Sequence, residues 1–230
     1  PRVTGLTALA AGTDLTANAD VDATAVDITA AEYATMATIQ DIVIESSPLS
    51  VAQDTGSVLG GAINQAMDEV IVDLFTSAST DVGPGAGAEM TVDHILKAAA
   101  TLRNNSVPMQ GLVAVVSPFQ AYNMKKTLLN AGGSLGNSLL ADRVSQDYVV
   151  GSIAGVTIVE SASIDVDGSD DAIGAVFHPA AIGMVLKRDL RITQEYDASL
   201  RGTEYVASAA FGAAILDQNK IVKITSDAAL

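Results

Sequence analysis

Cysteine is absent from the 230 residues, and histidine occurs only twice, at His94 and His178. The lack of cysteine excludes a disulfide framework, thiolate metal sites and a cysteine nucleophile. Two histidines also argue against a multi-histidine metal centre. No apolar run reaches the ~20 residues that a membrane-spanning helix needs, and no signal peptide is visible. The sequence therefore predicts no metal, no cofactor and no membrane association.

Aromatic residues are scarce as well, at 4% of the chain, although 49% of the residues are hydrophobic. Alanine, valine, isoleucine and leucine must therefore form the core, and the length is enough for one or two domains. The chain begins with Pro1 instead of methionine. From this we expect the processed or ordered part of a longer product.

Basic residues are missing from a long first part of the chain. No lysine or arginine occurs between Arg2 and Lys97, whereas residues 1–96 contain 14 acidic residues and have a net charge of -13, out of -15 for the whole chain. Such a charge argues against a nucleic-acid-binding protein, which needs clustered lysine and arginine residues to contact the phosphates. The acidic residues of this part cannot be neutralised by ion pairs within it, because Arg2 is its only basic residue. Either it faces solvent, or it lies against a basic surface from elsewhere.

The acidic part divides into an extended segment and a long helix. Residues 1–37 are rich in threonine, alanine and aspartate, which predicts an exposed β-hairpin or loop that cannot fold alone. Residues 38–47 alternate Ile39, Ile42 and Ile44 with polar neighbours and predict a strand. Apolar residues at three- and four-residue spacing then predict an amphipathic helix over about 50–77, which at ~1.5 Å per residue is about 40 Å long.

The rest of the chain mixes helices and strands. A glycine- and proline-rich segment, residues 79–90, predicts a hinge and a domain boundary. Ser117, Pro118 and Gln120 form a helix-start pattern. The further predicted elements are helices from Thr91 and from Ser117 to about Leu129, a loop over 130–138, strands over 111–117, 156–164, 172–177 and 181–186, and mostly extended chain from Leu190 to Thr225. This order indicates an α+β fold with two lobes.

The two histidines are the only candidates for a base that acts at neutral pH. His94 lies beside Asp93 on a predicted helix, and His178 precedes Pro179 between two strands, where it fits a turn. A Ser-His-Asp triad is not excluded by residue order, but no G-x-S-x-G motif presents a nucleophile. An α/β hydrolase is therefore the weakest functional hypothesis.

Ligand-binding motifs are incomplete. The glycine stretches 83–90 and 131–138 lack the Gly-Lys-Ser/Thr ending of a phosphate-binding loop, and 83–90 also lacks the third glycine of a dinucleotide site. The acidic stretch 165–171 resembles half of a calcium loop, with Asp165, Asp167 and Asp170, but its glycine is fourth instead of sixth and the twelfth position is Val176. We interpret this stretch as an acidic hairpin turn.

Three stretches of the sequence, taken in order, carry a resemblance to a known family. They are "GLVAVVSPFQAYNMKKTLLNAG", "VGSIAGVTIVESASI" and "GAVFHPAAIGMVLKRDLRITQEYDASLRGTEYVASAAFGAAILDQNKIVKI". In this order they resemble the major capsid proteins of tailed bacteriophages, which have the Hong Kong 97-type fold. The resemblance implies an extended E-loop over 1–37, a peripheral domain over 38–82 and about 185–230 with a spine helix over about 50–77, and an axial domain over 83–184.

The implied function is self-assembly into pentamers and hexamers of an icosahedral phage head around double-stranded DNA. The subunit would assemble in the host cytoplasm and reside in the virion, with scaffolding, portal and possibly cement proteins as partners and without sequence-specific DNA binding. We predict that acidic residues of the N-terminal part meet the basic cluster of another copy. The candidate contact residues are Asp14, Asp20, Asp22, Asp27, Glu32, Lys187, Arg188, Arg191 and Arg201.

One departure from the family and two further hypotheses remain. Some members cross-link subunits through a lysine of the E-loop, but residues 1–96 contain no lysine. Shell stability must then come from non-covalent contacts or from a cement protein. An encapsulin-like shell around enzyme cargo shares the fold and is the near alternative. A secreted acidic surface or adhesion protein is a more distant alternative. Such a protein should show repeats and complete calcium loops, and neither is visible in the sequence.

Overall fold

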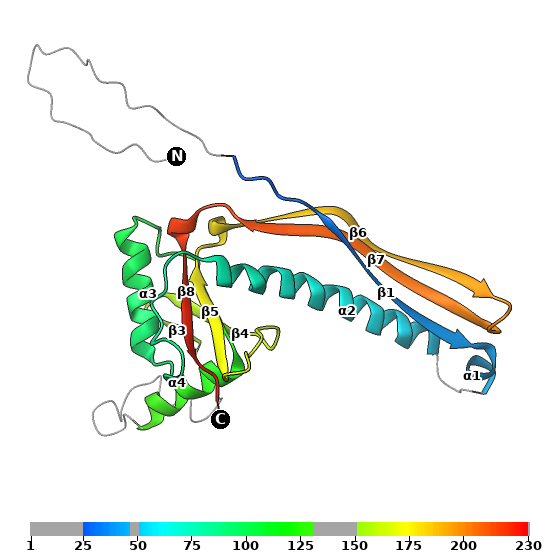
Figure 1. The fold of residues 1–230 in the computed structure, drawn as a ribbon, viewed down its shortest axis with the longest axis horizontal. Coiled ribbons are helices and arrows are strands. Elements are labelled where there is room, and N and C mark those ends of the chain that lie inside the picture. The colour runs from blue at the N-terminus through cyan, green and yellow to red at the C-terminus, as the bar shows by residue number, and fades with distance from the viewer. Residues whose placement is uncertain (1–24, 47–50, 131–150, 230) are drawn as a thin grey trace, which may run out of the picture.

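The computed structural model describes residues 25–46, 51–130 and 151–229. The chain forms a compact lobe, from which a long helix and three long strands extend side by side as an arm (Figure 1). The arm carries one strand from near the N-terminus and a hairpin of two strands from near the C-terminus. The lobe contains the middle of the chain and its last strand.

The arm is built on helix α2 (Val51–Asp73), which continues into a short 3-10 turn (Leu74–Ser77). This confirms the long helix predicted over about 50–77. Strands β1 (Ala31–Gln40), β7 (Gly202–Ile215) and β6 (Ile182–Asp197) form an antiparallel sheet in the order β1-β7-β6. Small side chains on β7 let the helix pack closely on the sheet, and Tyr33 stacks on Phe211 with ring centroids 4.4 Å apart. The buried residues between helix and sheet are Leu59, Ile63, Ala207, Ala209 and Phe211.

The N-terminal part of the arm differs from the sequence prediction. Residues 31–37 do not belong to a separate hairpin or loop, because they are part of β1 and pair with β7 throughout. Residues 38–47 do not form a strand beyond Gln40, since helix α1 (Asp41–Ser46) begins there. The reason lies in the register: Gln40 pairs with Gly202, the first residue of β7, so the chain beyond Gln40 has no strand partner. Residues 1–24 lie outside the described part.

The lobe is built on a second sheet, in the order β3-β4-β2-β5-β8. Its strands are β2 (Leu112–Val116), β3 (Ser152–Ile153), β4 (Val156–Glu160), β5 (Asp171–Phe177) and β8 (Ile221–Asp227). Strands β2 and β4 are parallel, and the other pairs are antiparallel. The sequence resemblance assigns residues from about 185 to 230 to the peripheral domain, which contains the arm. Strand β8 instead joins the lobe, because its apolar residues Ile221, Val222 and Ile224 are fully buried beside β5.

The lobe contains the two further helices that were predicted: α3 (Val92–Asn104), which packs on the sheet, and α4 (Pro118–Asn130). Thr91 is the residue that caps α3. At the start of α4, the side-chain oxygen of the buried Gln120 accepts a hydrogen bond from the Ser117 amide at 3.0 Å, which confirms the predicted start pattern. In the part of the chain that the structure describes, no helix has the length and apolar character needed to cross a bilayer.

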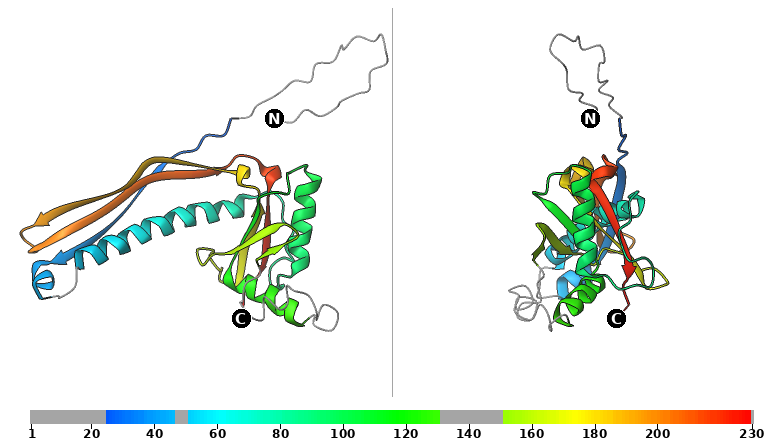
Figure 2. Two further views of the ribbon diagram at one scale, coloured as in Figure 1. Left: turned by 180° about the vertical axis from the view of Figure 1, so that it is seen from behind. Right: turned by 90° about the vertical axis from the view of Figure 1, so that its left-hand side faces the viewer.

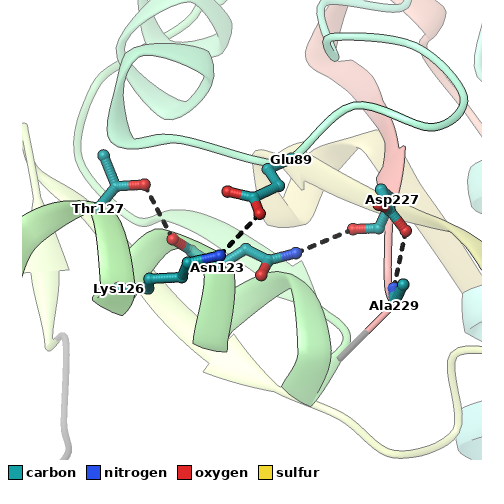
Figure 3. A network of polar contacts seen from close by, with 6 residues as sticks. All are labelled: Glu89, Asn123, Lys126, Thr127, Asp227 and Ala229. Atoms are coloured by element: carbon teal, nitrogen blue, oxygen red, sulfur yellow. Dashed lines mark hydrogen bonds and ion pairs between the residues drawn. The ribbon is translucent and has the colours of Figure 1, made fainter.

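The segment from Ala78 to Met90 is tied down and does not form the hinge that its glycines suggested. It runs along β8, with backbone hydrogen bonds from Val82 to Lys223 and from Gly85 to Thr225. Its end is anchored by Lys126 of α4, which pairs with Glu89 at 2.8 Å (Figure 3). In the same view, Asn123 of α4 donates a hydrogen bond to the Asp227 carbonyl and so joins α4 to β8. Gly83 allows close approach to Thr225 of β8, whereas Gly85 and Gly87 adopt positive φ angles of 91° and 70° with open space around them.

Arm and lobe meet at a buried apolar cluster, near the point where α2 runs into the lobe in the left view of Figure 2. Phe75 is fully buried there and lies 5.7 Å from Phe177 between ring centroids. Ala181 and Ile221, also fully buried, contribute from the turn that precedes β6 and from β8. The long helix is therefore fixed at its C-terminal end, and the rest of the arm projects from this cluster.

Candidate functional site

Strand β6 is the most exposed long element of the arm. It is an edge strand, so one row of its backbone groups has no partner within the described chain. Every residue from Met184 to Tyr196 is exposed. Natural proteins rarely leave such an edge uncovered, because it can pair with other chains. Large apolar side chains are exposed along it: Met184, Val185, Leu186, Leu190, Ile192 and Tyr196.

Two irregularities in β6 orient its basic residues. The register against β7 shifts between Leu186 and Arg188 and again between Arg188 and Arg191. After these shifts Arg188 lies opposite Ala210, and Arg191 lies opposite Ser208, two residues along β7. Since alternate residues of a strand point to opposite faces, both arginines project from the same face of the sheet. That face is opposite to the one that packs on α2.

One predicted pair of opposite charges forms inside the chain. Glu32 of β1 and Arg188 of β6 both lie opposite Ala210 of the central strand, and their side chains meet at 2.7 Å. The small side chain of Ala210 leaves room for this ion pair above β7. Both side chains are about half exposed, at 57% and 52%. Such a pair contributes about 1 kcal/mol or less to stability.

The other candidate contact residues fall into two groups. Asp14, Asp20 and Asp22 lie outside the described residues. Asp27 is exposed in the extended chain before β1, and Lys187, Arg191 and Arg201 are exposed on β6 and on the turn that follows it. Within residues 25–46, 51–130 and 151–229, no ion pair involves Lys187, Arg191 or Arg201. These three bases are available to a partner.

The far end of the arm exposes apolar residues that the sequence interpretation placed in a strand. Helix α1 has no buried residue, and its Ile42, Val43 and Ile44 are exposed. Hydrogen bonds shape the neighbouring turn: the Asp197 carboxylate accepts from the hydroxyl and amide of Ser199, which lowers the pKa of Asp197. The next residue, Leu200, is 50% exposed. The only sequence signal for this exposed apolar end of the arm was the run Ile42, Val43 and Ile44 directly after β1.

Neither histidine forms a catalytic arrangement. His178 makes the predicted turn, where its Nδ1 accepts a hydrogen bond from the Ala180 amide. His94 accepts a hydrogen bond at Nδ1 from the Thr91 amide at 3.1 Å, at the start of α3. The acidic stretch is also a turn, since Asp167 accepts from the amides of Ser169 and Asp171. Among the described residues, no group of three or more histidine or carboxylate side chains could hold a metal ion.

The lowered pKa of His94 leads us to predict that the stability of the protein depends on pH. Desolvation, followed by the positive charge of Lys97, lowers the pKa of His94 below its ordinary 6.5. As the pH falls, His94 therefore becomes protonated in the unfolded chain at a higher pH than in the folded chain. The stabilisation present above pH 6.5 is lost as the pH falls towards the lower folded-state pKa. Protonation also removes the acceptor for the Thr91 amide. We expect urea unfolding to show this loss between about pH 7 and 5.

The control variant is His94→Gln, because glutamine at this helix position retains an acceptor for the cap without titrating. Its stability should show a smaller decrease over the same pH range than the unmodified protein does. An unchanged pH slope in His94→Gln would assign the dependence to other groups.

Comparisons with known proteins rest on structure alone. No protein-family model matches the sequence, and no curated protein matches it by sequence. A chain in the structure of Mycobacterium phage Che8 is similar, with a TM-score of 0.72 and 21% identity, over 84% of this chain and 70% of that one. The capsid of cyanophage P-SCSP1u gives 0.71 and 19% identity, over 97% and 80% of the two chains.

The chain has the Hong Kong 97-type capsid fold. An encapsulin has it too: the SrpI encapsulin complex of Synechococcus elongatus PCC 7942 is similar with a TM-score of 0.65 and 9% identity, over 87% of this chain and 75% of that one. The Hong Kong 97-type fold was the architecture expected from the order of the sequence motifs, and this expectation is confirmed. The structural similarity shows the fold. Sequence identities of 9% to 21% are too low to assign a function, so the function is argued from the exposed surfaces of this chain.

Proposed function

We propose that this chain is the major capsid protein of a tailed bacteriophage, a structural subunit that assembles into an icosahedral shell. The exposed edge strand β6 carries this proposal. A strand of 16 residues with a free edge, exposed apolar side chains and three bases is suited to burial against another chain. The similarity to phage capsids supports a second copy as that chain.

The domain assignment follows the two sheets. We propose the three-stranded sheet with α2 as the peripheral domain and the five-stranded sheet with α3 and α4 as the axial domain. Strand β8 then belongs to the axial domain, although it lies within the range 185–230 that the sequence had assigned to the peripheral one. In this arrangement pentamers and hexamers would place their lobes near the symmetry axis and their arms at the rim.

The basic residues of β6 would bind the acidic chain that precedes β1 in a neighbouring copy. Arg188 and Arg191 project from the sheet face opposite α2, and Arg188 already accommodates one carboxylate, that of Glu32. Asp14, Asp20, Asp22 and Asp27 would approach the same face from the neighbour. Charge complementarity of this kind selects the partner and the register more than it adds affinity.

An encapsulin-like shell is the second candidate, favoured by the similarity to the SrpI complex. That similarity has a lower TM-score than the two phage structures give. The two proposals differ in what the shell holds. A phage head encloses double-stranded DNA, acquired through a portal after assembly with a scaffolding protein, whereas an encapsulin shell encloses enzyme cargo.

Electron microscopy tests the proposed function. We expect the full-length product, expressed with its scaffolding protein, to form closed shells of uniform size. Shells isolated from infected cells should contain nuclease-protected DNA. Enzyme cargo in place of DNA would favour the encapsulin candidate. Small soluble species alone, under all assembly conditions and with scaffold present, would contradict both.

A further inference from the structure

We propose a specific head-to-tail contact in the shell: the outer flank of helix α2 in one copy packs on the α2-facing side of strand β6 in the next. This inference rests on the proposed function, because it names the partner of β6. It concerns the opposite sheet face from the one that presents Arg188 and Arg191. The two contacts can therefore coexist on one strand.

The receiving surface is an apolar row on β6. Met184, Leu186 and Ile192 pair with Ala213, Phe211 and Ala207, so they lie on the sheet face that packs on α2. The helix packs mainly on β1 and β7, however, and barely reaches β6. The row therefore remains open. Its side chains are 42%, 50% and 45% exposed.

The inserted surface is a stripe on the exposed flank of α2. Its residues are spaced three or four positions apart and so share one face of the helix. Val58 lies in this stripe and is 70% exposed, the largest exposure among the big apolar side chains of the described chain. Helix α2 contains four acidic residues and no basic residue. The stripe consists of Asp54, Val58, Ala62, Gln65 and Glu69, all exposed.

The stripe and β6 lie on opposite sides of the arm. Gly60 of α2 faces β6, since a Cβ atom there would lie 3.7 Å from the Leu190 side chain. Val58 and Ala62 are each two residues from Gly60, which turns them by about 200° around the helix axis. One copy therefore cannot bring Val58 to its own β6. A closed ring of identical copies needs such a contact, because each copy presents one patch forward and a different one backward.

Charge does not oppose this pairing. The α2 stripe carries Asp54 and Glu69, whereas Gln194 and Tyr196, which share the α2-facing side of β6 with Leu186 and Ile192, are uncharged. An apolar centre with a charged rim is the usual composition of a specific interface. Val58 would insert between Leu186 and Ile192, and Asp54 and Glu69 would lie at the rim of the contact.

Cysteine cross-linking tests the contact directly, because the chain contains no cysteine. We would prepare Val58→Cys and Leu186→Cys separately, co-assemble them and treat the shells with a short bis-maleimide. The expected product is a covalent dimer that forms only in the mixture. The double variant, Val58→Cys with Leu186→Cys, should yield a ladder extending to pentamers and hexamers.

Controls separate this contact from others. Either single variant alone should give no dimer, since a dimer from one variant would mean that like patches meet, which overturns the head-to-tail contact. Leu96→Cys, at a similarly exposed leucine on α3, replaces Leu186→Cys as the matched control and should give no dimer with Val58→Cys. Normal shells without any cross-link in the mixture would overturn the contact and leave the shell function standing. Failure of the unmodified chain to form shells would overturn the shell function itself.

Discussion

Replacement of Lys187, Arg188 and Arg191 by glutamate is expected to abolish shell assembly while the subunit stays folded. All three side chains are exposed, and the one ion pair that is lost, Arg188 with Glu32, is about half exposed. The subunit should therefore lose about 1 kcal/mol or less of stability. Between copies, the change places acid against acid. Repulsion of several kcal/mol per contact would raise the subunit concentration needed for assembly by far more than tenfold.

The measurement is the yield of shells by sedimentation and electron microscopy, with circular dichroism to verify the fold. The matched control reverses three exposed bases of the lobe, Lys97, Arg103 and Lys126, and so changes the net charge equally. We expect that control to keep assembling better than the β6 variant. Equal assembly of the β6 variant and the unmodified protein would contradict the proposed pairing.

Gly83→Ala is expected to cause the largest loss of subunit stability. A Cβ atom at Gly83 would lie 2.2 Å from the Thr225 carbonyl oxygen and 2.5 Å from the Thr225 amide nitrogen. Both are backbone atoms of β8, which is buried in the lobe and cannot retreat without losing its pairing with β5. Overpacking of this kind costs up to about 3 kcal/mol. Urea unfolding, monitored by circular dichroism, measures this loss.

Gly61→Ala in α2 is the matched control, since the same atom is added where nothing lies within 4 Å. There the substitution should stabilise the protein by about 1 kcal/mol, because glycine is a poor helix former. The two variants thus predict opposite signs for one chemical change. A stability of Gly83→Ala equal to that of the unmodified chain would show that the segment from Ala78 to Met90 is not held against β8.

Local sequence signals predicted α2, α3 and α4 well, but not the short helix α1. The three- and four-residue spacing of apolar residues determines α2 and α3, and the pattern at Ser117 and Gln120 determines where α4 begins. The sequence also predicted the turn at His178. These features depend on residues within a few positions of one another, so the local sequence is sufficient to predict them.

Features that depend on distant partners were harder to predict. The alternation of Ile39, Ile42 and Ile44 indicates a strand, but the strand ends at Gln40 because β7 begins at Gly202. The glycines of residues 79–90 resemble a hinge until β8 is placed beside them. Likewise, the bases of β6 are visible in the sequence, whereas the register shifts that turn Arg188 and Arg191 to one face are not. The exposure of Val58 on α2 depends on which side of the helix the sheet covers.

The pairing of β1 with β7 has a consequence for synthesis on the ribosome. Strand β1 ends at Gln40, and the strand that pairs with it begins at Gly202. At bacterial rates of up to about 20 residues per second, β1 waits on the order of 10 s for its partner to be translated. Helix α2 likewise emerges before the sheet that buries Leu59 and Ile63. The arm therefore completes its fold only when nearly the whole chain has been made, so truncated products would expose β1 and the apolar face of α2 together.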